Sequence, residues 1–166
     1  MCLQYLMDEK KVKRIIDHMP EKVKVYKVVA ERISNKEYIP PYSILNSPSR
    51  KYIDPTPYKE GLNEAVTLWN IGEVKTDLID NIYRSGFHFY KDKAKARQSA
   101  RYMNKFNTGK KPVFKFKVVT CTVKKEWITA IGKQWGITRG RYDIMDSTAM
   151  SNIIVTNKVI FPKRRK

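Results

Sequence analysis

The feature that most constrains the fold is a stretch of alternating side chains at residues 112–123. Phe114 and Phe116 alternate there with Lys115 and Lys117, and a period of two residues is that of a β-strand. A strand buried on both faces would not carry these lysines, so we expect one face to be wet or to cover a ligand. The chain must therefore build a sheet around this segment.

Other segments also have strand composition, in which β-branched and aromatic residues dominate. Residues 152–161 predict either one strand or a hairpin that turns at residues 156–158. Residues 61–83 are ambiguous and leave open a short helix near 62–69, followed by a strand or a helix near 77–83. The remaining expected strands cover residues 22–30, 87–90 and 126–132.

Two segments have the hydrophobic period of helices. Residues 9–19 carry apolar side chains at i, i+3, i+4 and i+7 from Val12, directly after the capping residue Asp8. Residues 92–106 predict a strongly basic helix, which Asp92 can cap. Together with a sheet that is mixed or antiparallel, these helices predict an α+β fold.

We expect a single domain over residues 1–162, because a chain of 166 residues has the usual length of one domain. Residues 38–58 hold five of the eight prolines, interleaved with four tyrosines. Because proline cannot donate to a ladder, this segment predicts an extended loop, pinned to the body by its tyrosines. Residues 163–166 form a basic tail.

The cysteines and histidines limit the metal chemistry of the chain. Cys2 and Cys121 lie far apart and form no CxxC pair, and adding His18 and His88 gives no zinc site of ordinary spacing. We therefore expect no bound metal. The chain begins without the apolar core of a signal peptide and has no run of about 18 apolar residues, which predicts an intracellular protein without a membrane partner.

Positive charge is concentrated in the second half of the chain. Of the formal net charge of +18, +16 lies after Tyr90, where the sequence has 20 Lys or Arg and 4 Asp or Glu. Residues 1–90 carry 14 and 12, respectively. Self-repulsion of this size opposes a compact fold unless a partner neutralises it. The distribution predicts a basic face for nucleic acid or another polyanion.

Cations and aromatic rings share the segment from Phe87 to Lys117, a mixture that allows phosphate contacts together with base stacking. No motif that reads a base sequence is present, so we expect binding to be electrostatic. About five phosphate contacts predict a slope of log K against log salt between about −4 and −5. Tyr90 and Tyr102 are the candidate stacking residues. The candidate polyanion-binding residues are Lys93, Arg97, Arg101, Lys105, Lys110, Lys111, Lys115, Lys117, Arg139, Arg141, Lys163, Arg164 and Arg165.

His88 is a candidate catalytic residue, because histidine can act as a general acid or base near neutral pH. The spacing of the sequence assigns it no acidic partner, and a packing role is the simpler alternative. The chain has no GxGxxG, Walker-type or HExxH motif.

The order of elements from Tyr26 onward resembles the ADP-ribosyltransferase fold. In the poly-ADP-ribose-polymerase branch, a G-x-Y-F-A strand leads into a helix rich in Ser and Ala, and here residues 86–90 read GFHFY. The catalytic glutamate of that branch begins a late N-E-Y-I-V strand, and here residues 151–155 read SNIIV. The resemblance implies NAD as a cofactor and makes His88 and Asn152 the catalytic candidates. His88 replaces a tyrosine that stacks on nicotinamide, and Asn152 replaces the glutamate, so transferase chemistry would be lost or altered.

The whole chain also resembles small accessory proteins of phages and prophages that begin with MCL and contain a YKV strand and a GFH segment. The leading hypothesis is therefore a non-enzymatic accessory protein that binds nucleic acid or another polyanion and acts on host defence or host machinery, with a host protein as a further class of partner. One alternative is an ADP-ribosyltransferase-like enzyme, or a degenerate relative that binds NAD or a nucleotide. Another is a virion component that neutralises packaged genome. No cofactor is expected outside the NAD alternative.

Overall fold

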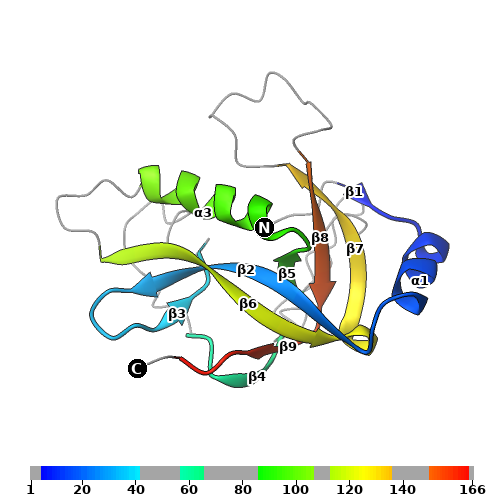
Figure 1. Ribbon diagram of the computed structural model, residues 1–166, viewed down its shortest axis with the longest axis horizontal. Helices are drawn as coiled ribbons and strands as arrows, with labels where there is room; N and C mark the ends of the chain where they lie inside the picture. Colours follow the sequence, from blue (N-terminus) through cyan, green and yellow to red (C-terminus); the bar gives the residue numbers. More distant parts are fainter. Residues whose placement is uncertain (1–4, 42–56, 66–85, 107–112, 136–149, 165–166) are drawn as a thin grey trace, which may run out of the picture.

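Two long strands, β2 (Lys22–Arg32) and β6 (Phe114–Lys124), form the centre of the fold. The computed structural model describes residues 5–41, 57–65, 86–106, 113–135 and 150–164 (Figure 1). β2 and β6 pair antiparallel over their full length, from Lys22 opposite Lys124 to Arg32 opposite Phe114. The strands expected at residues 22–30 and 112–123 are thus confirmed.

The described strands form one nine-stranded sheet in which every pairing is antiparallel. With the two helices, this confirms the α+β fold. β3 (Tyr38–Ile39) pairs only with β2, off the main path of the sheet. The other strands follow the spatial order β1 (Tyr5–Leu6), β7 (Ile128–Trp135), β8 (Met150–Thr156), β5 (Phe87–Tyr90), β2, β6, β9 (Lys158–Phe161) and β4 (Gly61–Glu64).

The sheet narrows to a single residue pair between β5 and β2, at Tyr90 opposite Tyr26. β8 lies in the part of the sheet that holds β7 and β5, whereas β9 lies beyond β6. The chain passes from one part to the other at Asn157, whose N–H donates to the carbonyl of Trp127 at 3.1 Å. Both alternatives for residues 152–161 are therefore wrong: β8 and β9 are two separate strands, and they pair with different neighbours instead of with each other.

Both expected helices are present. α1 (Glu9–Asp17) begins after Asp8, whose carboxylate accepts from the backbone N–H of Lys11 at 2.8 Å. α3 (Lys93–Phe106) begins after Asp92, whose carboxylate accepts from the N–H of Ala94 at 2.7 Å. A 3₁₀ turn, η2 (Lys125–Trp127), joins β6 to β7. Neither α1 nor α3 has the length and apolar run that crossing a bilayer would need.

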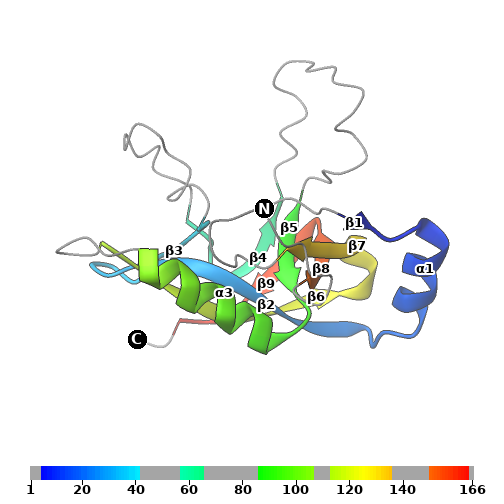
Figure 2. The same ribbon diagram turned by 90° about the horizontal axis from the view of Figure 1, so that it is seen from above.

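The apolar core has two parts. In the first, Ala96, Ala100 and Met103 of α3 pack against Val28 and Phe116 of the β2–β6 ladder. Figure 2 shows α3 lying along one face of that ladder, with α1 at the far end of the molecule. The second part is enclosed among strands, and α1 adds a half-buried apolar stripe at its margin. Its buried residues are Val25, Val29, Phe89, Val119, Cys121, Val123, Ile128, Ile131, Ile154, Val159 and Phe161.

The structure revises the interpretation of two irregular segments. Residues 61–64 form strand β4 opposite β9, where the sequence suggested a helix near 62–69. Gly61 explains the start of this strand, because its φ of 81° breaks the preceding backbone direction. Residues 38–39, at the start of the proline-rich segment expected to be a loop, form strand β3 instead, and at the end of that segment the ring of Tyr58 stacks on Phe161 at 4.6 Å between centroids. The rest of that segment, residues 42–56, and the element expected near 77–83 lie outside the described residues.

Candidate functional site

A row of four cations follows one side of α3. Lys93, Arg97, Arg101 and Lys105 are spaced by four residues, and all four are exposed. Residues at i and i+4 are neighbours on a helix, and like charges at this spacing destabilise it by roughly 0.2–0.5 kcal/mol per pair. α3 has five Lys or Arg and no Asp or Glu, so no carboxylate on the helix relieves the repulsion. We call these four residues the cation row.

Three members of the cation row line a groove of about 420 Å³ between α3 and β6. Lys93, Arg97 and Arg101 line it on the helix side, and Val118 and Thr120 are among the residues that line it on the strand side. Thr120 is exposed and Val118 is half-buried, so this stretch of β6 is open to solvent. The groove therefore combines a cationic wall with an accessible strand.

Asn104 closes one end of the groove by bonding to the β6 backbone. Its amide N–H donates to the carbonyl of Phe116 at 2.8 Å, and its carbonyl oxygen accepts from the N–H of Phe116 at 2.9 Å. A side-chain amide carries the same donor and acceptor as a peptide group. Asn104 thus takes the place that a neighbouring strand would occupy, and it holds α3 beside β6.

Lys115 and Lys117, although predicted to share this surface, point to the other face of β6. Side chains alternate along a strand, and Phe116 packs on the α3 side. The ammonium of Lys117 forms an ion pair with Glu31 and lies 4.7 Å from the centre of the Tyr38 ring. Lys117 is among the residues that line the groove, but its ammonium is already paired with Glu31 and does not extend the cation row.

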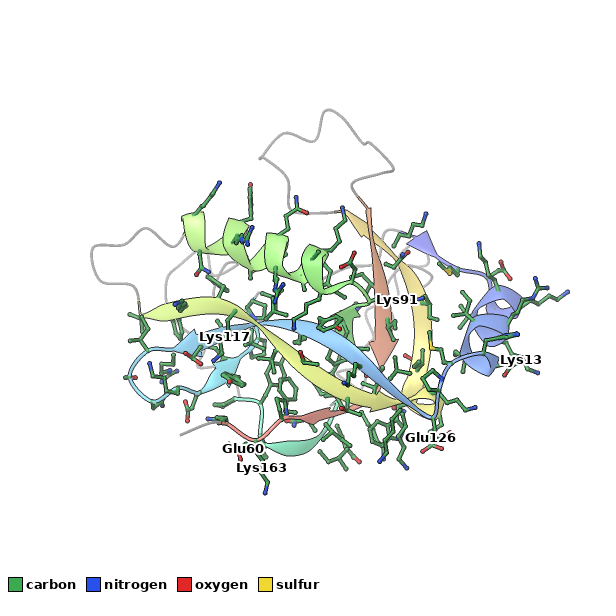
Figure 3. All side chains as sticks on the ribbon, viewed as in Figure 1. Lys13, Glu60, Lys91, Lys117, Glu126 and Lys163 are labelled. Carbon is green, nitrogen blue, oxygen red and sulfur yellow. The ribbon has the colours of Figure 1, made fainter. Side chains whose placement is uncertain are left out.

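The basic tail also lies apart from the cation row. The guanidinium of Arg164 donates to the carbonyl of Tyr58 at 2.9 Å and lies 3.9 Å from Glu60. Figure 3 shows Lys163 beside Glu60, on the opposite side of the β2–β6 ladder from α3. The other predicted cations, Lys110, Lys111, Arg139, Arg141 and Arg165, lie outside the described residues.

The two candidate stacking residues are buried to different degrees, and a third aromatic ring, which the sequence did not suggest, lies closer to the cation row. Tyr90 is buried in the core, so its ring cannot stack on a base. The same burial raises the pKa of its hydroxyl. Tyr102 is half-buried on α3. Tyr26 lies next to the cation row, with the ammonium of Lys93 5.8 Å from its ring centre. Its alternation with buried neighbours in β2 was the only signal in the sequence.

His88 is neutral at physiological pH. Its Nδ1 lies 3.2 Å from the carbonyl of Gly86, and because a carbonyl only accepts, Nδ1 carries the proton and Nε2 does not. Burial and the nearby charge of Lys27 lower the pKa of the imidazole to about 4. No carboxylate among the described residues raises this pKa. A histidine in this state is a weak base at pH 7.

His88 and Asn152, the candidates taken from the ADP-ribosyltransferase resemblance, lie on opposite faces of the sheet. His88 pairs with Val155, so the two side chains share a face. Asn152 is three residues before Val155 and therefore points to the other face. The structure does not bring these two side chains into one site.

No group of three or more potential metal-ligating His, Cys, Asp or Glu side chains occurs within the described part of the chain. Comparisons with protein-family models, curated proteins and solved structures found no match. The groove between α3 and β6, with its cationic wall, is the candidate functional site.

Proposed function

We propose that this protein binds a polyanion in the groove between α3 and β6. The observation that carries the proposal is the cation row. It contains three successive i, i+4 pairs in which two cations repel each other, and the helix has no carboxylate that would offset this repulsion. Together these pairs destabilise α3 by about 1 kcal/mol, and an anionic ligand would remove this cost. A surface that served solubility alone would not need its cations in one row beside a groove.

The geometry favours recognition of charge rather than of base sequence. α3 packs its apolar side on the sheet, and its cations flank a groove instead of projecting from a free helix. A helix that reads a major groove must enter it, which a helix packed in this way would do poorly. The ligand class is therefore a flexible anionic chain, nucleic acid or acidic protein. A role as an accessory protein of a phage, acting on host machinery, is compatible with such binding and is part of the proposal.

Salt dependence tests the proposal directly. Fluorescence anisotropy would be recorded with labelled single-stranded DNA, RNA and duplex DNA over a series of salt concentrations. Four contacts from the cation row predict a slope of log K against log salt of about −3 for a single strand and about −4 for a duplex. Absence of binding to every anionic chain at low salt would overturn the proposal.

A matched pair of double variants locates the site. Lys93→Gln with Arg97→Gln removes one Lys and one Arg from α3, and Lys13→Gln with Arg14→Gln removes the same charges from α1. Lys13 lies on α1, far from α3 (Figure 3). We expect the α3 variant to lower the salt slope by about one per residue removed, and the α1 variant to leave it nearly unchanged. Equal effects of the two variants would show that net charge, and not the groove, determines binding.

A further inference from the structure

The outer edge of β6 is the edge that faces away from β2. Its backbone groups have hydrogen-bond partners at both ends of the groove but none from the described residues between them. At one end Asn104 holds both backbone groups of Phe116, which shows that the N–H and C=O of Phe116 point away from β2. At the other end Thr122 pairs with Ile160 of β9. Backbone groups alternate in direction along an antiparallel strand, so those of Val118 and Thr120 also point outward, into the groove.

Pro162 explains why β9 does not cover this edge. Counting from Ile160 opposite Thr122, the antiparallel register would place Pro162 opposite Thr120. Proline has no N–H to donate, so the ladder between β6 and β9 stops after one pair. The chain then leaves the edge, and Arg164 bonds to Tyr58 and Glu60 instead.

The twist of the sheet sets the position of the open stretch. Figure 1 shows β6 running beside α3 at its start and beside β9 at its end. Within the described portion of the chain, no backbone group pairs with the outward N–H and C=O of Val118 and Thr120. An unpaired edge of this kind is a template for a further strand.

We propose that an extended acidic peptide adds to β6 at Val118 and Thr120 as a short strand; this rests on the polyanion-binding function proposed above. Five residues lie between Phe116 and Thr122, which at ~3.3 Å per residue gives room for about five peptide residues. The outward groups of Val118 and Thr120 offer two donors and two acceptors. Main-chain hydrogen bonds supply affinity in strand addition, and side-chain contacts supply specificity.

The charges beside the groove indicate which peptide sequence would bind there. Alternate side chains of an added strand would face α3, where Lys93, Arg97 and Arg101 lie. The intervening side chains would face the other side of β6, where Lys117 is already paired with Glu31. Acidic residues at every second position, separated by uncharged residues, therefore match the groove.

The open edge also distinguishes a peptide from a nucleic acid strand. A phosphodiester backbone carries acceptors but no donors, so it could accept from the N–H groups of Val118 and Thr120 but would leave their carbonyls unpaired. A peptide backbone satisfies both. An unsatisfied polar group that loses its water opposes binding, which favours the peptide.

The test compares three labelled probes on the full chain: a ten-residue peptide of alternating Glu and Val, the same peptide N-methylated at alternate residues, and a single-stranded oligodeoxynucleotide. N-methylation keeps the charge but removes the donors needed for strand pairing. We expect the unmodified peptide to bind at least about tenfold more tightly than the methylated one, because two or more backbone hydrogen bonds are lost. Amide exchange at Val118 and Thr120 should slow only with the unmodified peptide.

Thr120→Pro provides a second test, because it removes an outward N–H without touching the pairing of β6 with β2. We expect it to weaken binding of the peptide but not of the oligonucleotide, and retained binding of the oligonucleotide shows that the variant is folded. Equal binding of the two peptides, or binding of the oligonucleotide alone, would overturn the strand-addition proposal while leaving polyanion binding intact. Failure of all three probes at low salt would instead overturn the polyanion-binding function itself.

Discussion

The side-chain ammonium of Lys27 donates a hydrogen bond of 2.9 Å to the backbone carbonyl of His88. It thereby spans the place where β2 and β5 separate after their single residue pair. Lys27 is only 8% exposed, and its ammonium lies 5.4 Å from the centre of the Phe89 ring. Buried lysines normally have a carboxylate partner, and no such ion pair forms here among the described residues. Burial lowers the pKa of the Lys27 ammonium from 10.5 to about 8.

The first prediction concerns the pH dependence that Lys27 causes. Its pKa is lower in the folded than in the unfolded chain, so between pH 8 and 10.5 the unfolded state binds more protons. The contribution of Lys27 to the free energy of unfolding must therefore rise with pH across this window, by roughly 3 kcal/mol at most. Lys27→Met should be more stable than the wild type at pH 7 by roughly 1–3 kcal/mol, and this advantage should shrink toward pH 10.5.

Urea unfolding of both proteins at each pH measures this difference. The comparison is needed because burial raises the pKa of Cys121 to about 12 and also raises the pKa of Tyr58, and both effects destabilise the fold as pH rises. These contributions are present in both proteins and largely cancel. A stability difference between wild type and Lys27→Met that stays constant from pH 7 to 10.5 would contradict the prediction.

The second prediction compares two glycines with positive φ. A Cβ at Gly86, where φ is 148°, would lie 2.6 Å from the carbonyl oxygen of Thr156 and 3.1 Å from a methyl of Val155. Gly61 has a φ of 81°, but a Cβ there would meet nothing within 4 Å. Gly86→Ala should destabilise the protein by roughly 2–4 kcal/mol, and Gly61→Ala by about 1 kcal/mol from backbone strain alone. Thermal unfolding of both variants tests this, and an equal loss at the two sites would refute the clash at Gly86.

The third prediction concerns the Asn104 amide. Asn104→Ala leaves both backbone groups of Phe116 without their partner, which should cost roughly 1–3 kcal/mol in the free energy of unfolding. Gln98→Ala is the control, because Gln98 is exposed on the same helix and should change stability by less than about 0.5 kcal/mol. Amide exchange at Phe116 should accelerate only in the Asn104 variant. If the two variants were equally stable, Asn104 would not be what holds α3 beside β6.

The fourth prediction separates stability from binding in the cation row. Arg97→Glu replaces two repulsive pairs, with Lys93 and Arg101, by two attractive ones, and should stabilise the protein by roughly 1 kcal/mol at low salt. The same change should weaken binding of an anionic oligonucleotide by more than tenfold. Added NaCl should reduce the gain in stability, because these charges are exposed. A variant that lost stability, or that bound the oligonucleotide as well as the wild type, would be incompatible with this role of the row.

Patterns within single segments predicted much of the fold. α1, α3, β2 and β6 follow from periodicity and capping residues, because these depend on neighbours within a few positions. Lys27 also has a signal in the sequence, since it is two residues from both Val25 and Val29 and so belongs to the buried face of β2. The helix expected near 62–69 is wrong at β4, because a strand of four residues is too short to show a period.

The excess of cations after Tyr90 and the row at every fourth position of α3 are properties of the sequence alone, because charge and helical spacing do not depend on distant residues. Which cations share a surface was decided by the tertiary structure. Strand alternation directs Lys117 to Glu31, and the path of the tail directs Arg164 to Glu60. The open edge of β6 lies between the contact of Asn104 with Phe116 and the single pair of Thr122 with Ile160, which come from segments far apart in the chain. Such long-range pairing is set by the packing of the whole sheet, which no local pattern encodes.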